Sequence, residues 1–143
     1  MASHGYPSDQ IWMRNTENEN AVGNLVLHLC GNVNQWIGSG VAGKPDHRER
    51  DGEFAARGGD LGTRLSTTIA EATGIIRGLT PARLSEHITV QKYDVTVMEA
   101  IYHAVEHFAQ HTAQIIFATK LLTGQDLGYY QHLNKPKHLE TTP

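Results

Sequence analysis

Apolar residues recur at the period of a helix in three long stretches of the chain, and no pair of segments shows the alternating pattern of paired strands. The first stretch runs from about Asn20 to Ile37, and Gly38 is predicted to end it. The second opens at Asp60, a predicted N-cap, and stops at Gly78. Its predicted buried stripe has near-heptad spacing and consists of Leu61, Leu65, Ile69, Ala72, Ile76 and Leu79.

The third stretch predicts the longest helix, from Thr96 to about Leu122. The letters TVME at its start have the spacing of a capping box. Its large apolar residues lie on one side, and beside them runs a strip of small residues and histidines that consists of Ala100, Ala104, His107, His111 and Ala118. A strip of alanines indicates close helix packing, so His107 and His111 are expected to face a neighbouring helix. The three stretches together predict an all-α fold.

The whole chain, residues 1–143, is predicted to form a single domain, because its length is that of one domain and no shift in composition divides it. Residues 1–19 are polar and poorly defined as an element. Residues 38–59 form a glycine- and charge-rich connection that is too long for an ordinary bundle loop. A short turn of helix is expected in this connection, around Glu53 to Arg57.

Composition and charge exclude several classes of partner. The net charge of -3 and the scattered basic residues give no electrostatic face for a nucleic acid. Apolar runs fall far short of the roughly 18 residues that span a bilayer, and the N-terminal residues lack the apolar core of a signal peptide. Cys30, the single cysteine, fits a reducing compartment. A soluble, cytoplasmic protein is therefore expected.

Histidine is the unusual component, with nine copies. The letters HAVEHFAQH place His103, His107 and His111 at successive intervals of four, so either neighbouring pair could hold one ion on a helix face. The alternative is a solvated polar face. A mononuclear catalytic site usually has three protein ligands, and His28 in NLVLHLCGN is a candidate for the third. By itself, His28 is more typical of a packed core histidine.

Two other metal motifs are considered and set aside. The letters HAVEH satisfy H-x-x-E-H, the inverted zinc-peptidase motif, with Glu106 as the general base. On a helix, however, Glu106 lies about 100° from each flanking histidine, and no distal glutamate is evidently placed as a third ligand. A di-iron carboxylate bundle needs paired Glu-x-x-His motifs, which the sequence lacks.

The segments NLVLHLCGNVNQWI, DHRERDGEF and AIYHAVEHFAQHTAQIIFATKLLTGQDLGYY resemble the DinB/YfiT-like family of metal-dependent bundle proteins. The resemblance extends from about Asp9 to His132. The family motif pairs one histidine in a helix of the HLxGN type with an HxxxH that precedes xxQI. His28 matches the first part, and His107 and His111 match the second. The resemblance therefore implies an antiparallel helical bundle and selects these three residues as metal ligands.

The resemblance also implies a cofactor and an activity. The cofactor is one divalent ion completed by water, Ni or Zn first, with Fe, Mn or Co as alternatives, while His103, Asn32 and Gln114 would orient ligands or substrate. The implied activity is metal-dependent transfer of a small-molecule thiol to a small electrophile. A metal-dependent hydrolase is one alternative, and a non-catalytic metal-binding or oligomerising bundle protein is another.

The sequence departs from the family in its first part. Members usually have a further long helix before the NLVLHL helix, whereas here the polar residues 1–19 occupy that place. Three long helices with broad apolar faces would leave a patch larger than a soluble monomer usually exposes. A homodimer that covers the patch is therefore predicted, with the histidine site remaining within each chain. The alternative is that the N-terminal segment and the glycine-rich connection fold over the patch and leave a monomer.

Overall fold

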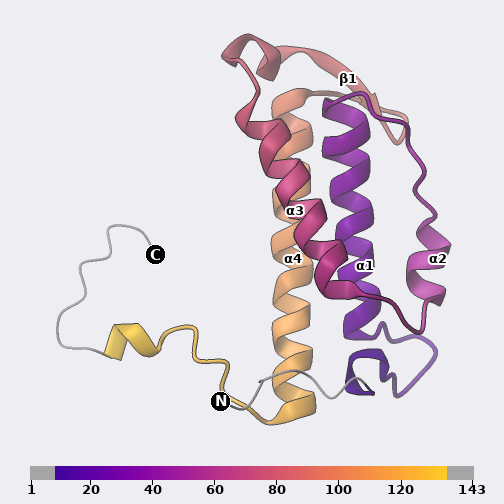
Figure 1. Ribbon diagram of the computed structural model, residues 1–143, viewed down its shortest axis with the longest axis vertical. Helices are drawn as coiled ribbons and strands as arrows, with labels where there is room; N and C mark the ends of the chain where they lie inside the picture. The colour runs from indigo at the N-terminus through magenta and orange to yellow at the C-terminus, as the bar shows by residue number, and fades with distance from the viewer. Residues whose placement is uncertain (1–8, 135–143) are drawn as a thin grey trace.

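The computed structural model describes residues 9–134 and is mostly helical, with three long helices packed together and a small two-stranded hairpin (Figure 1). The long helices are α1 (Val22–Val33), α3 (Leu61–Arg77) and α4 (Val97–Thr123). The fold predicted from the sequence, with three long helices, is confirmed. The shorter elements are η1 (Gln10–Trp12), η2 (Asn34–Val41), α2 (Arg50–Ala55), η3 (Pro81–Ser85), β1 (His87–Val90), β2 (Tyr93–Thr96) and η4 (Gln131–Asn134).

Helix α1 is the central element, because α2, α3 and α4 all pack against it (Figure 1). None of its residues is exposed, in agreement with a sequence that is apolar around most of the helix. Three polar side chains are nevertheless buried along it: Asn24, His28 and Asn32. Buried polar groups need partners, so these three residues point to the contacts that organise the molecule.

The first helix does not end where the sequence predicted. Instead of stopping at Gly38, the chain continues through the π-helical η2 as far as Val41. Gly40 allows a close approach, because a Cβ atom built on it would lie 2.4 Å from the Val90 side chain of the hairpin. Gly43, with φ of 71°, then leaves the helical conformation. Gly40 therefore permits close packing against the hairpin, and Gly43 follows the end of the helical segment. Neither Gly38 nor Gly40 stops the helix.

The predicted stripe of the second long helix is wrong at two positions. Ile69 and Ile76 are exposed, whereas Thr68 is buried and Ile75 lies against the core. The positions that turn inward have the strict four-three alternation of a heptad repeat: Leu61, Leu65, Thr68, Ala72, Ile75 and Leu79. Thr68 and Ile75 therefore take the places in the stripe that the sequence assigned to Ile69 and Ile76.

The hairpin of β1 and β2 was not predicted. The strands pair antiparallel, with His87 opposite Thr96 and Val90 opposite Tyr93, around a two-residue turn. Both turn residues, Gln91 and Lys92, have positive φ, which glycine or asparagine would normally signal in a sequence. With strands of four residues and no such signal, the alternation is too short to recognise.

Helix α4 begins and ends as predicted. The Thr96 hydroxyl accepts a hydrogen bond from the Glu99 backbone N–H at 3.1 Å, and the Glu99 carboxylate accepts one from the Thr96 N–H at 2.7 Å. Gly124, with φ of 64°, ends the helix in the left-handed conformation. Within residues 9–134, no helix combines the length and apolar character needed to cross a lipid bilayer.

Candidate metal centre

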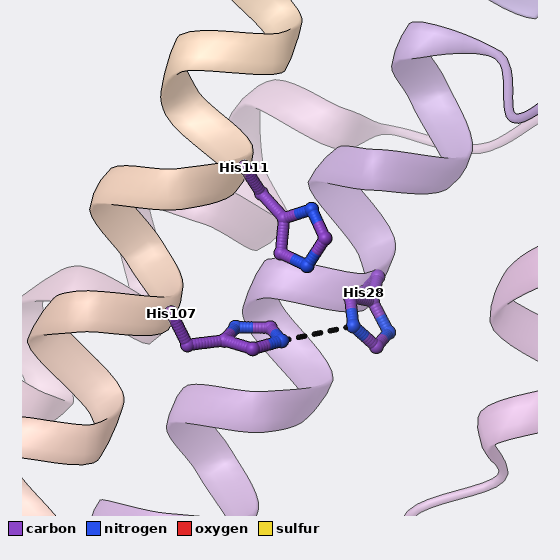
Figure 2. Close-up of side chains that lie close together, drawn as sticks. All are labelled: His28, His107 and His111. Atoms are coloured by element: carbon purple, nitrogen blue, oxygen red, sulfur yellow. Dashed lines mark hydrogen bonds between the residues drawn. The ribbon is translucent and has the colours of Figure 1, made fainter.

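Three histidines from two helices converge between α1 and α4. His28 comes from the middle of α1, and His107 and His111 come from successive turns of α4 (Figure 2). One ligand nitrogen from each lies within 4.8 Å of the others. His28 Nε2 and His107 Nε2 are 3.0 Å apart. His28 is buried and the other two are half-buried, so the group sits at the edge of the core.

The separations suit a single ion. Two imidazole nitrogens that bind one ion at about 2.0–2.1 Å can be at most about 4.2 Å apart. The pair formed by His28 and His107 is already inside this limit. The widest separation that the group allows, 4.8 Å, would have to shorten by only about 0.6 Å, which side-chain rotation can supply.

A buried carboxylate fixes the ring of His28. Glu53, from α2, lies with Oε2 2.9 Å from His28 Nδ1, and Arg48 donates to the same carboxylate, at 2.8 Å to Oε1 and 3.1 Å to Oε2. Burial raises the pKa of Glu53, but the hydrogen bonds from His28 and Arg48 outweigh it, so the pKa lies below the usual value for a glutamate. An ionised Glu53 accepts the Nδ1 proton of His28 and leaves the Nε2 lone pair directed at His107.

The carboxylate reaches His28 because Gly31 has no side chain. A Cβ atom at Gly31 would lie 1.8 Å from Glu53 Oε1 and 3.0 Å from Arg48 Nε. Asn24, one turn before His28, holds α2 in place by donating to the backbone carbonyls of Glu53 at 2.9 Å and Ala56 at 3.0 Å. The short helix α2 is therefore fastened to α1 at the site.

His107 is held in its neutral form. Burial, and then the charges that His111 and His28 would carry when protonated, lower its pKa to about 4. Its Nδ1 atom is buried and has no hydrogen-bond partner among the described residues. A neutral imidazole with an available lone pair is the form that binds a metal.

A family match extends over nearly the whole chain. Residues 2–138 match the family described as "Protein of unknown function (DUF1572)". The chain belongs to the DUF1572 family. Neither the comparison with curated proteins nor that with solved structures found a match. The family description assigns no function, so the chemistry of this DUF1572 protein has to be inferred from its own residues.

The three residues expected to orient ligands or substrate have different surroundings in the DUF1572 protein. Gln114 Oε1 lies 2.6 Å from His111 Nδ1, where it can accept that proton and leave Nε2 free. His103 instead stacks on Trp36 with ring centroids 3.8 Å apart, and its Nε2 lies 3.4 Å from Asn32 Nδ2. His103 and Asn32 thus contact each other, and His103 is not one of the three convergent histidines.

Sequence reasoning missed Glu53 and Arg48. Both lie in the segment DHRERDGEF that contributed to the family resemblance, but nothing in its spacing indicated a role. A helical turn was expected at Glu53 to Arg57, and α2 instead begins at Arg50. The contact with His28 joins residues 25 apart in the chain, so helix periodicity carries no signal for it.

Other candidates for site chemistry lie apart from this group. Cys30 is fully buried, and burial raises the pKa of its thiol, as expected for a small core residue. Glu106, the base of the rejected peptidase motif, is exposed. A cleft of about 640 Å³ lies on the far side of Glu53. The residues of this cleft that come from the site region are Gly31, Arg48 and Glu53, and none of the three histidines lines it.

Proposed function

We propose that this DUF1572 protein binds one divalent transition-metal ion through His28, His107 and His111, with water completing the coordination. The observation that carries the proposal is the convergence of the three imidazoles within 4.8 Å from two packed helices. The side chains beside the rings also favour metal binding. Glu53 can accept the Nδ1 proton of His28, and Gln114 that of His111, so each ring keeps an Nε2 lone pair for the ion.

The donor set favours Zn²⁺ or Ni²⁺. Imidazole nitrogen suits zinc, nickel, copper and iron, whereas manganese prefers oxygen ligands. The nearest carboxylate, Glu53, is already occupied by His28 and Arg48, and Cys30 is buried away from the group. Fe, Mn or Co remain alternatives that metal analysis would distinguish.

For the reaction, we infer thiol transfer to a small electrophile, on the basis of the resemblance to the DinB/YfiT-like family. When bound, the ion would supply a Lewis acid that lowers the pKa of a thiol and so generates the nucleophile. The chain itself would orient His28 through Glu53 and His111 through Gln114. Activation of water would make the protein a hydrolase, and absence of any reaction would leave a metal-binding protein.

Metal binding is tested by titrating the untagged, metal-free chain with Zn²⁺ and Ni²⁺ in a calorimeter, together with metal analysis of the purified protein. We expect one equivalent, and alanine at His28, His107 or His111 should weaken binding at least about 100-fold, since a three-ligand site becomes a two-ligand site. His103→Ala should retain most of the affinity. The matched control is His87→Ala in the exposed hairpin. Equal loss from His103→Ala and none from His28→Ala would overturn the assignment.

Activity is tested separately, with a panel of small thiols and electrophilic acceptors assayed with and without the bound metal. Metal-dependent consumption of both thiol and acceptor supports transfer. Turnover of the acceptor without thiol supports hydrolysis. A chain that binds one equivalent of metal but turns over nothing in the panel is a binding protein, and the transfer proposal is then wrong while the metal site stands.

The Glu53 contact gives a prediction of its own. Glu53→Gln keeps the shape of the side chain but removes its charge, so the His28 ring loses its charged acceptor and Arg48 its partner. We expect metal affinity to fall by about 10–100-fold while the helical circular dichroism is retained. The matched control is Glu49→Gln, an exposed carboxylate immediately before α2, which should bind metal as the parent chain does. Unchanged affinity in Glu53→Gln would show that the carboxylate does not orient the ligand.

A further inference from the structure

The outer face of α4, on the side away from the three histidines, exposes large apolar side chains. Tyr102 is 70% exposed, Val105 59% and Met98 46%. Single exposed apolar residues are normal on a protein surface, but a continuous series along one helix face is not. We therefore expect this face to contact a partner.

The spacing along this face is that of a coiled coil. We define the α4 seam as Met98, Tyr102, Val105, Ala109, Thr112 and Ile116. Successive members are four, three, four, three and four residues apart, the alternation of a and d positions in a heptad repeat, and none is charged. Helices with such a seam bury it against another helix, and α4 already uses a different face to pack on α1.

The middle of the seam is hollowed. A shallow depression of about 470 Å³ is lined entirely by α4 residues: Val105, Phe108, Ala109, Thr112, Ala113 and Ile116. Small residues occupy its middle, and larger ones stand towards its ends. The set is symmetric in sequence, because each member has a counterpart at the same distance from the point between residues 110 and 111. A twofold axis beside this point would set the depression of one chain against that of a second chain.

We propose that a second copy of this chain packs on the α4 seam in antiparallel orientation, about a twofold axis between residues 110 and 111. Val105 then lies opposite the partner's Ile116 and Ala109 opposite the partner's Thr112, while Phe108, on the other edge of the seam, lies on the same side as the partner's Phe108. Small side chains meet near the axis, which allows the two helices to approach closely. A twofold interface of this kind uses one patch on both chains.

Charge selects the antiparallel orientation. Positions at seven-residue intervals form one edge of the seam, and they carry Glu99, Glu106, Ala113 and Lys120 in that order. Antiparallel pairing places Glu99 near the partner's Lys120 and Glu106 near the partner's Ala113. A parallel pair would instead place Glu106 near the partner's Ile101 and Lys120 near the partner's Ile115, so no glutamate of this edge would meet a lysine. The acidic half of each edge therefore matches the neutral and basic half of the other.

The arrangement goes beyond the metal site and does not depend on it. The three histidines lie between α1 and α4 of one chain, so the seam stays free to pair whether or not metal is bound (Figure 2). The dimer thus covers the apolar surface without contributing ligands. Loss of metal binding in the histidine variants would leave this inference unaffected.

Sedimentation analysis of the full chain at micromolar concentration tests the dimer. We expect a mass of twice the 15.8 kDa of one chain. Ala109→Glu and Thr112→Arg should each give a monomer with unchanged helical circular dichroism and one equivalent of metal bound. The control is Ile69→Glu, which charges an exposed isoleucine on α3 and should stay dimeric. A parent chain that remains monomeric throughout, or an Ala109→Glu variant that remains dimeric, overturns the proposal.

Cross-linking tests the orientation with smaller substitutions. A chain with both Ala109→Cys and Thr112→Cys should form a covalent dimer under mild oxidation, because each cysteine would face the other position of the partner. Each single variant, and the parent chain with its buried Cys30, should stay uncross-linked. Efficient cross-linking of either single variant would indicate parallel helices, and no cross-linking of the double variant would show that the seam is not the interface.

Discussion

Replacing Gly31 with alanine is expected to lower the free energy of unfolding by about 3–5 kcal/mol. The added Cβ would lie 1.8 Å from Glu53 Oε1, so the buried carboxylate has to move. Movement breaks its contacts with Arg48 and His28, and breaking a buried ion pair is among the most damaging changes that a single substitution can make. Urea unfolding followed by circular dichroism measures the loss.

The matched control is Gly74→Ala in α3. No neighbouring atom lies within 4 Å of a Cβ built there, and φ is not in the left-handed region. Alanine in that helix should therefore stabilise the protein by about 0.5–1 kcal/mol. If both variants changed stability alike, the close approach at Gly31 would not be what requires a glycine.

Asn24→Ala is the second large effect that we expect, with a loss of about 3–4 kcal/mol. The amide of this fully buried residue donates to the carbonyls of Glu53 and Ala56, and its oxygen accepts from the Ala21 N–H at 3.2 Å and from Arg14 at 2.8 Å. Without the side chain, several buried groups lose their partners, each at about 1–3 kcal/mol before relaxation.

Asn34→Ala is the control for Asn24, because Asn34 lies on the same continuous helix but is exposed. It should change stability by no more than about 0.5 kcal/mol. Thermal unfolding of the two variants in parallel provides the comparison. A small effect at Asn24 would mean that water replaces the lost hydrogen bonds and that α2 is not held through this residue.

Features that depend on contacts within a few residues were predicted correctly from the sequence. The capping box at Thr96 and the glycine at 124 define α4 through contacts within a few residues, and both were recognised in the sequence. The stripe of alanines on α4 likewise indicated the side that packs closely, where Ala100 and Ala104 are buried. Periodicity could not choose between the two histidine pairs of α4. That choice came from the family resemblance.

Features that depend on contacts between residues far apart in the chain were missed or predicted wrongly. Val90 of the hairpin approaches Gly40 closely, a contact between segments that are far apart in the chain. Which of the adjacent Ile75 and Ile76 turns inward depends on the elements against which α3 packs, not on the letters alone. Glu53 becomes part of the site only because α2 folds back onto α1. No pattern among neighbouring residues predicts that α2 packs against α1.

The contact between His28 and Glu53 also bears on the order in which the site can assemble. It closes a separation of 25 residues, whereas the contact between His28 and His107 closes one of 79. Loop-closure entropy grows with the logarithm of the separation, so the shorter closure is favoured by about 1 kcal/mol. A folding chain therefore reaches the orientation of the first imidazole at a lower entropic cost than the pairing of α1 with α4. Loop-closure entropy alone therefore favours orienting the His28 ring by Glu53 before α1 pairs with α4.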